Sequence, residues 1–153
     1  MVEIATRKQP NRYPWEDKEQ SGIYRFFDGL EKGKLLSTRC KKCHHFNWPP
    51  MIVCTKCLSD QVLWRELPKG GRIIAYSLSY TGNSQHPELI CTIELSNGLR
   101  MLGRIIGSKY KDLSNGLEVT RKKVGLLEGR PFWTYELTGR SKSKEGKTVT
   151  QSR

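Results

Sequence analysis

Hydrophobic positions follow a helical period in the first third of the chain and a strand period in the second half. Near the N-terminus, apolar residues fall at i, i+3, i+4 and i+7, which is the spacing of one helix face. That face consists of Ile23, Phe26, Phe27 and Leu30. Gly29 and Gly33 are expected to loosen and then end this helix, and Tyr13-Pro14-Trp15 can open a shorter helix upstream. The pattern predicts one amphipathic helix whose aromatic face packs against the fold or lines a groove.

The second half of the chain reads as short strands. Five segments alternate or are rich in β-branched and aromatic residues, at 71–80, 88–95, 99–106, 117–127 and 132–137. The clean alternation in the second of them places Leu89, Cys91, Ile93 and Leu95 on one face. Asn97-Gly98 is a strong hairpin turn. Five strands with no long helix between them fit a small closed barrel of the OB type, so the predicted fold is mainly β.

Composition limits how much of this chain can be held together by a hydrophobic core. With 153 residues, 36% hydrophobic content and a mean hydropathy of −0.62, a small lobe needs an additional staple. No run of eighteen apolar residues is present, and the N-terminus lacks the apolar stretch of a signal peptide. We therefore expect a cytoplasmic protein. A reducing compartment argues against a disulfide framework for the five cysteines.

The net charge of +12 is unevenly distributed. Lys and Arg outnumber Asp and Glu by three to none in residues 40–57, by eight to four in 100–138 and by five to one in 139–153. Such an excess suits a phosphate-bearing partner, either nucleic acid or a nucleotide cofactor, but it is equally typical of a solvated basic surface. The segment from position 139 has almost no apolar residue and is expected to be a disordered basic tail.

The stretch CKKCHHFNWPPMIVCTKC contains two Cys-x-x-Cys pairs, which supply four soft ligands from two tight turns. The predicted zinc ligands are Cys40, Cys43, Cys54 and Cys57. His44 and His45 could substitute, but four thiolates already close a tetrahedral shell, so the zinc is expected to be structural and to contribute on the order of 10 kcal/mol to folding. The neighbouring lysines, Lys41, Lys42 and Lys56, are placed to offset the charge of the site.

No residue is predicted to be catalytic. Cys91 lies on the apolar face of an alternating strand, where a free cysteine is usually a small core residue. The sequence contains no nucleophile elbow, phosphate-binding glycine loop or paired-carboxylate signature. We therefore do not expect an enzyme that acts alone.

The order of the parts resembles a known family. Four segments follow one another as in the two-domain zinc-ribbon/OB-fold family that is catalogued as domain of unknown function thirty-five and described as acyl-CoA-associated. These segments are FFDGLEKGKLLSTRCKKC, WPPMIVCTKC, LPKGGRIIAYSLSY and HPELICTIELSNGLRMLGRII. The resemblance covers about residues 20–137. This chain departs from the family at His44, where a glycine often follows the knuckle, and in the Leu-Ser-Asn-Gly hairpin, which lacks the usual Asp.

The resemblance implies a rubredoxin-like zinc ribbon packed on an OB-fold, and a non-catalytic role beside thiolase-type enzymes. The partners it implies are a thiolase and a hydroxymethylglutaryl-CoA synthase, enzymes of the mevalonate route to isoprenoids, with acyl-CoA as a candidate ligand. The domains expected are an N-terminal helical segment (1–35), a zinc ribbon (36–66), an OB-fold (67–138) and the basic tail (139–153).

Nucleic-acid binding is the alternative function, since zinc ribbons and OB-folds both occur in proteins that bind nucleic acids. It requires exposed rings on the barrel, whereas the strand aromatics can equally belong to the core. These aromatics are Tyr76, Tyr80, Trp133 and Tyr135.

An acyl-CoA site needs cations for its phosphates and an apolar passage for its pantetheine arm. Candidates for the passage are Phe26, Phe27, Trp48 and Pro50, and candidates for the phosphates are Arg121, Lys122 and Lys123. The same aromatic residues are also plausible core, and the basic run a solvated strand end.

Overall fold

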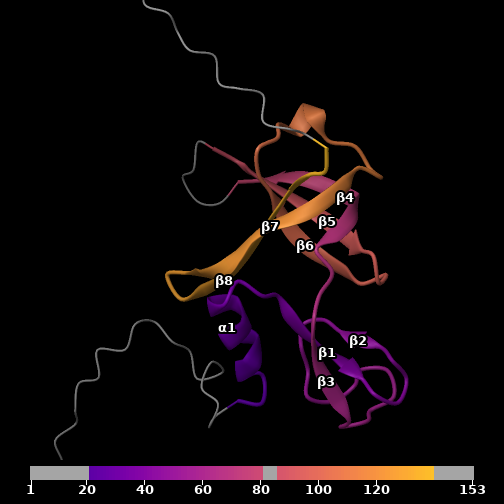
Figure 1. The fold of residues 1–153 in the computed structure, drawn as a ribbon. Coiled ribbons are helices and arrows are strands. Elements are labelled where there is room, and N and C mark those ends of the chain that lie inside the picture. The colour runs from indigo at the N-terminus through magenta and orange to yellow at the C-terminus, as the bar shows by residue number, and fades with distance from the viewer. Residues whose placement is uncertain (1–20, 81–85, 140–153) are drawn as a thin grey trace, which may run out of the picture.

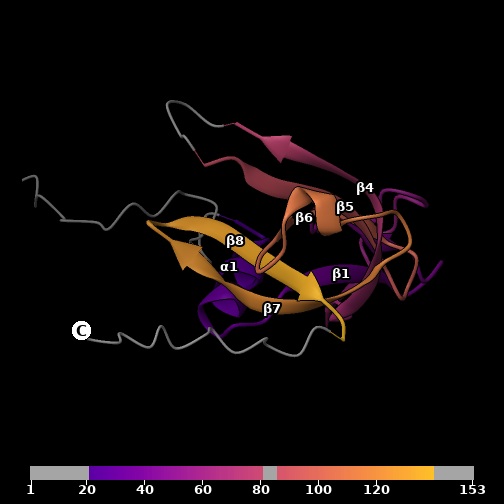
Figure 2. The same cartoon turned by 90° about the horizontal axis from the view of Figure 1, so that it is seen from above.

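The computed structural model describes residues 21–80 and 86–139. A short helix and a three-stranded ribbon lie at one end of a five-stranded barrel, and the hairpin of β7 and β8 extends from the barrel over the helix (Figures 1 and 2). The upstream helix expected at Tyr13-Pro14-Trp15 and the basic tail beyond position 139 lie outside the described residues. Within the described part of the chain, no helix is long and apolar enough to cross a membrane.

The predicted amphipathic helix is present as α1 (Tyr24–Glu31). Phe26, Phe27 and Leu30 of its apolar face are buried. Gly29 does not loosen the helix, contrary to the expectation from sequence. It lies inside α1 and permits close packing, because a Cβ there would come within 2.7 Å of Leu36 Cγ. Gly33, with φ of 69°, follows the helix end as expected.

The ribbon is an antiparallel sheet in the order β2-β1-β3, formed by β1 (Leu36–Cys40), β2 (Phe46–Asn47) and β3 (Val62–Glu66). The central strand β1 pairs through Thr38 with both Asn47 and Trp64. Its last residue is the first predicted zinc ligand, Cys40. The ribbon therefore sets the position of one cysteine pair directly.

The barrel is closed in the order β4-β5-β6-β8-β7, the strand order of an OB-type barrel. Its strands are β4 (Gly70–Ser79), β5 (Glu88–Leu95), β6 (Arg100–Ile105), β7 (Glu118–Leu127) and β8 (Arg130–Leu137). The pair β6–β8 is parallel and the other pairs are antiparallel. A 3₁₀ turn, η2 (Tyr110–Asp112), lies in the connection before β7. All five predicted strands are confirmed, with ends that differ by at most two residues.

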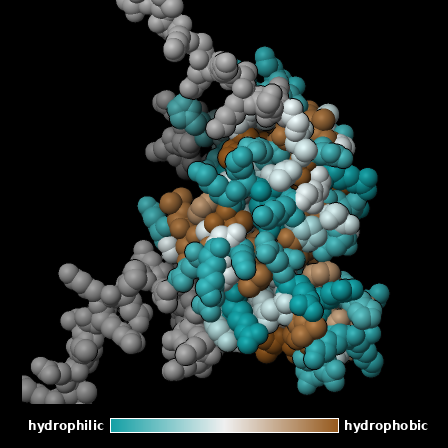
Figure 3. Space-filling model, viewed as in Figure 1, coloured by the Kyte–Doolittle hydropathy of each residue, from teal (hydrophilic) through white to brown (hydrophobic). Residues whose placement is uncertain are grey.

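The barrel interior follows the alternation predicted from sequence. Leu89, Cys91, Ile93 and Leu95 of β5 are all buried. Tyr135 of β8 is fully buried and needs the absence of a side chain at Gly103, where a Cβ would lie 2.7 Å from its ring. The exterior is largely hydrophilic on the face shown in Figure 3, with apolar areas at the ribbon end and beside the β7–β8 hairpin.

Candidate metal centre and ribbon–barrel junction

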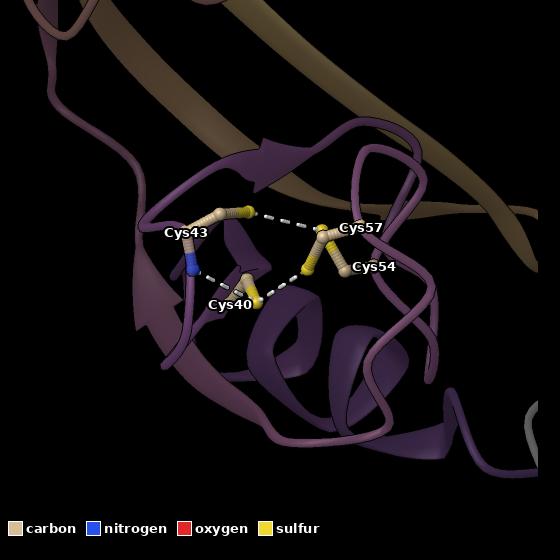
Figure 4. A group of neighbouring side chains, drawn as sticks. All are labelled: Cys40, Cys43, Cys54 and Cys57. Carbon is tan, nitrogen blue, oxygen red and sulfur yellow. Dashed lines mark hydrogen bonds between the residues drawn. The ribbon is translucent and has the colours of Figure 1, made fainter.

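The four cysteines of the two knuckles converge on one point (Figure 4). All four Sγ atoms lie within 4.8 Å of one another, and the Cys40–Cys57 and Cys43–Cys54 sulfur pairs are 3.5 Å apart. Ligands at Zn–S distances of 2.3 Å in a tetrahedron are roughly 3.8 Å apart. The donor set and its spacing therefore fit a Zn²⁺ ion, and the four thiolates would close its shell and leave no open position for a substrate.

Backbone N–H groups of the two knuckles are directed at the sulfur atoms of Cys40 and Cys54. The N–H groups of Lys42 and Cys43 point at Cys40 Sγ from 3.3 and 3.5 Å, and the N–H of Lys56 points at Cys54 Sγ from 3.4 Å. The Cys43 N–H, followed by the Lys42 N–H, lowers the pKa of Cys40 to about 6, although burial acts in the opposite direction. This favours the thiolate at Cys40, which is the form that binds metal. At Cys57 the Ser59 N–H acts in the same direction, but burial and the three other thiols outweigh it and raise the pKa to about 12.

A buried asparagine ties the second knuckle to the ribbon, and sequence reasoning missed it. Asn47 is fully buried, and its Nδ2 donates to Thr38 Oγ1 at 3.0 Å. Its Oδ1 accepts from both the N–H and the hydroxyl of Thr55, each at 3.0 Å. Since Thr55 directly follows Cys54, these bonds hold the second cysteine pair against β1. No sequence pattern marks Asn47, because its partners lie nine positions before it and eight positions after it, outside any local motif.

An aromatic cluster joins the helix, the ribbon loop and the barrel. The ring of Trp48 lies 6.0 Å from that of Phe26 and 5.4 Å from that of Trp133, both edge to face. Phe27 packs against Phe26 at 5.2 Å, and Trp133 Nε1 donates to the Leu102 carbonyl at 2.7 Å. The structure thus brings together the rings considered for an acyl-CoA passage, and they contact one another at the junction. Pro50 is buried in the same ribbon loop.

The basic run on β7 divides into one buried and two exposed side chains. The side chain of Arg121 is 2% exposed; it donates to the carbonyls of Pro68 and Leu67 at 3.0 Å each and pairs with Glu66 at 3.3 Å. Arg121 is therefore engaged at the connection between β3 and β4, and the expectation that it meets a phosphate has to be corrected. Lys122 pairs with Glu136 at 2.8 Å, and Lys123 is exposed.

The strand aromatics considered for nucleic-acid stacking do not share an exposed face. Tyr135 is fully buried, and Trp133 packs on Trp48. Tyr76 is half-buried and lies 5.2 Å from the ring of Tyr110, which leaves Tyr80, at 70% exposed, as the one open ring of the four. Stacking successive bases requires several open rings, so this arrangement does not support the nucleic-acid alternative.

Cys91 is a core residue. It is fully buried on β5, and burial raises its pKa to about 11. The prediction that Cys91 is a small core residue is therefore confirmed, and a protonated, inaccessible thiol is a poor nucleophile.

A groove of about 640 Å³ lies at the end of the barrel where β4 begins. Gly70, Gly71, Gly98 and Gly116 line it, and so do Arg72 and Glu94, which pair at 2.6 Å between the neighbouring strands β4 and β5. None of the acyl-CoA candidates lines this groove.

Comparison with known proteins agrees with this architecture. A profile of the ChsH2 rubredoxin-like zinc ribbon domain matches residues 27–62. The chain is 30% identical over 94 residues to a DUF35 domain-containing scaffold protein of Methanocaldococcus jannaschii. The aligned region covers 58% of this chain and 67% of that protein.

Two solved structures share the fold. A structure described as the Ltp2–ChsH2(DUF35) aldolase matches with a TM-score of 0.63 and 19% identity, covering 74% of this chain and 92% of its own. A DUF35-family protein of unknown function from Sulfolobus solfataricus matches with a TM-score of 0.52 and 20% identity, covering 80% and 91%. At these identities the two structures establish similarity of fold alone.

Proposed function

The chain belongs to the DUF35 family, and from this membership we propose that it is a non-catalytic accessory protein that holds a catalytic partner in a complex. The observation that carries the proposal is its relationship over 94 residues to a DUF35 scaffold protein, together with the zinc ribbon match at residues 27–62. A structural neighbour whose description names Ltp2 together with ChsH2 in one aldolase supports the same role. Scaffolding also suits a metal centre whose four thiolates leave no site for a substrate.

The partner we propose is a condensing enzyme of the thiolase type, or a hydroxymethylglutaryl-CoA synthase, in the cytoplasm. This follows from the family resemblance of the ribbon and barrel motifs. A reducing compartment suits the proposal, because zinc ligation by four cysteines requires them to remain thiolates.

We further propose that acyl-CoA binds at the junction of ribbon and barrel when the partner is present. Lys122 and Lys123 would supply cations for the phosphates. Lys123 is exposed, and both side chains of the Lys122–Glu136 pair are accessible to solvent. Trp48, which is half-buried, would present the apolar wall, and Phe26, Phe27 and Pro50 are buried behind it and would support it. Arg121 would support this surface from beneath, by fixing the connection between the two parts, and would not touch the ligand.

Complex formation with purified enzymes tests the scaffold role. The full chain is mixed with a thiolase and with a hydroxymethylglutaryl-CoA synthase from the same organism, and complexes are measured by size-exclusion chromatography with light scattering. We expect a stable complex with at least one of them and no turnover of acyl-CoA by the chain alone. Failure to bind either enzyme, or recovery of the native protein with RNA as its released ligand in mass spectrometry, would overturn the proposal.

Acyl-CoA binding has a separate test. Lys122→Glu with Lys123→Glu should weaken CoA binding to the complex, and more strongly at low salt, where charges are least screened. Arg100→Glu is the charge-reversal control, because Arg100 is an exposed cation on β6, outside the basic pair of β7, and pairs with Glu94 of β5. Equal affinity of the double variant and the native chain at low salt would remove this basic pair from the site.

A further inference from the structure

The second zinc knuckle is surrounded by exposed apolar side chains. Met51, Ile52 and Val53 lead into Cys54 and are 45%, 56% and 38% exposed, and Leu58 directly after Cys57 is 80% exposed. The Leu58 N–H donates to the Cys54 carbonyl at 2.9 Å, so Leu58 follows a turn that begins where the Met51–Val53 segment ends, and Ile52 of that segment lies beside Gly22. We call these four residues, which flank the second cysteine pair of the ribbon, the knuckle patch. Grouped exposed apolar residues of this kind mark interaction sites more often than scattered ones do.

Leu58 has an unfavourable backbone conformation in addition to its exposure. Its φ of 57° lies in the left-handed region, where an L-residue with a Cβ is disfavoured and glycine is the usual occupant. The equivalent position of the first knuckle, His44, has φ of 60° but carries a polar side chain. A leucine that is strained and four-fifths exposed gains little from packing in the free chain. Its side chain is therefore better explained by burial against another molecule.

The charges around the knuckle patch indicate what kind of molecule covers it. Lys41, Lys42 and Lys56 are exposed, and none of them pairs with a carboxylate among residues 21–80 and 86–139. The thiolates lie beneath this surface, buried or half-buried, and Asp60 is the nearest acid along the chain. A second copy of this chain would add its own three lysines to the same contact, because a two-fold interface uses the same patch of both subunits. The chain's own C-terminal segment is also basic and has few apolar residues.

We propose that the knuckle patch is the surface on which the catalytic partner docks, and that the partner offers an apolar depression rimmed by carboxylates. This rests on the proposed scaffold function and names the part of the molecule that performs it. Leu58 is the anchor that enters the depression, Ile52 and Met51 extend the apolar contact, and the three lysines set the orientation through charge.

Variants at Leu58 separate docking from stability. Leu58→Gly removes the side chain and relieves the left-handed strain, so the free chain should melt at the native temperature or above it, while its affinity for the purified condensing enzyme should fall by about tenfold or more. Ile52→Ser should weaken binding in the same direction. Lys56→Glu should weaken it chiefly at low salt. Leu102→Ser is the matched control, because Leu102 is 61% exposed on barrel strand β6, and its binding should be native.

The outcomes distinguish this inference from the scaffold proposal. Native affinity in both Leu58→Gly and Ile52→Ser would overturn the knuckle patch and leave the scaffold role intact. A native chain that binds no condensing enzyme would overturn both. A native dimer in sedimentation that Leu58→Gly dissociates would show that a second copy covers the patch, and a lower melting temperature of Leu58→Gly would show that Leu58 stabilises the free chain instead.

Discussion

Replacing Arg121 by methionine tests how the ribbon is held on the barrel. The guanidinium donates to the carbonyls of Leu67 and Pro68 in the three-residue connection between β3 and β4, and it pairs with Glu66 at the end of β3. Methionine retains most of the apolar stem but removes every donor. The variant therefore isolates the polar contacts of this junction from its packing.

The expected cost follows from what each acceptor loses. A buried acceptor without a partner costs about 1–3 kcal/mol, and two carbonyls are affected. Glu66 is 39% exposed, so water can replace Arg121 at its carboxylate and that pair adds little. We expect a loss of about 3 kcal/mol in the free energy of unfolding, which for a domain of this size lowers Tm by about 10 °C.

Calorimetry and urea denaturation of the zinc-loaded chain measure this loss. Lys122→Met is the matched control, because it makes the same kind of replacement at the next residue, where the cation is 50% exposed and its pair with Glu136 is worth about 0–1 kcal/mol. Zinc content should remain at one ion per chain in both variants. An Arg121→Met protein that melts within 2 °C of the control would refute the assignment of Arg121 to the junction.

Three further predictions concern the metal centre, the barrel core and the barrel end. In the zinc-loaded chain no thiol should react rapidly with a thiol reagent, and chelation of the zinc should expose four reactive cysteines. The fifth cysteine, Cys91, should react only when the chain unfolds. Rapid labelling of Cys91 in the folded chain would contradict its core position. Gly103→Ala should cost about 1–3 kcal/mol, measured by urea denaturation, because its Cβ would press on the Tyr135 ring; a native midpoint would contradict that packing. Hydrogen bonds and charge from Arg72 and Arg100 lower the pKa of Glu94, so Glu94→Gln should melt below the native chain at neutral pH. The difference in melting temperature should reach its full size above the pKa of a glutamate in the unfolded chain, about 4.3, and should disappear as the pH falls through the lower pKa of Glu94 in the folded chain. A difference that does not change with pH would exclude the charge as its cause.

The barrel strands and the cysteine cluster could be predicted because their signals are local. Alternation along 88–95 reports one buried face, and two Cys-x-x-Cys pairs report two metal-binding turns. Arg121 could not be placed in the same way. It belongs to a run of three cations that resembles a solvated strand end, yet it shares the buried face of β7 with Val119.

The missed features depend on partners that no local sequence pattern identifies. Arg121 is buried because acceptors some 55 positions earlier meet it. A register shift between Arg121 and Lys123 then leaves both neighbouring lysines on the outside. The contact of Trp48 with Trp133, and the bonds of Asn47 to Thr38 and Thr55, likewise join segments that only the folded chain brings together.

The position of Arg121 also has a consequence for synthesis on the ribosome. The zinc ligands and all three ribbon strands precede β4, so the ribbon emerges complete before any barrel strand has been made. The residues that fix it against the barrel, Arg121 on β7 and Trp133 on β8, are translated near the end of the described chain. A nascent ribbon can therefore take up its metal early, whereas its orientation relative to the barrel is settled only when the last hairpin has been translated.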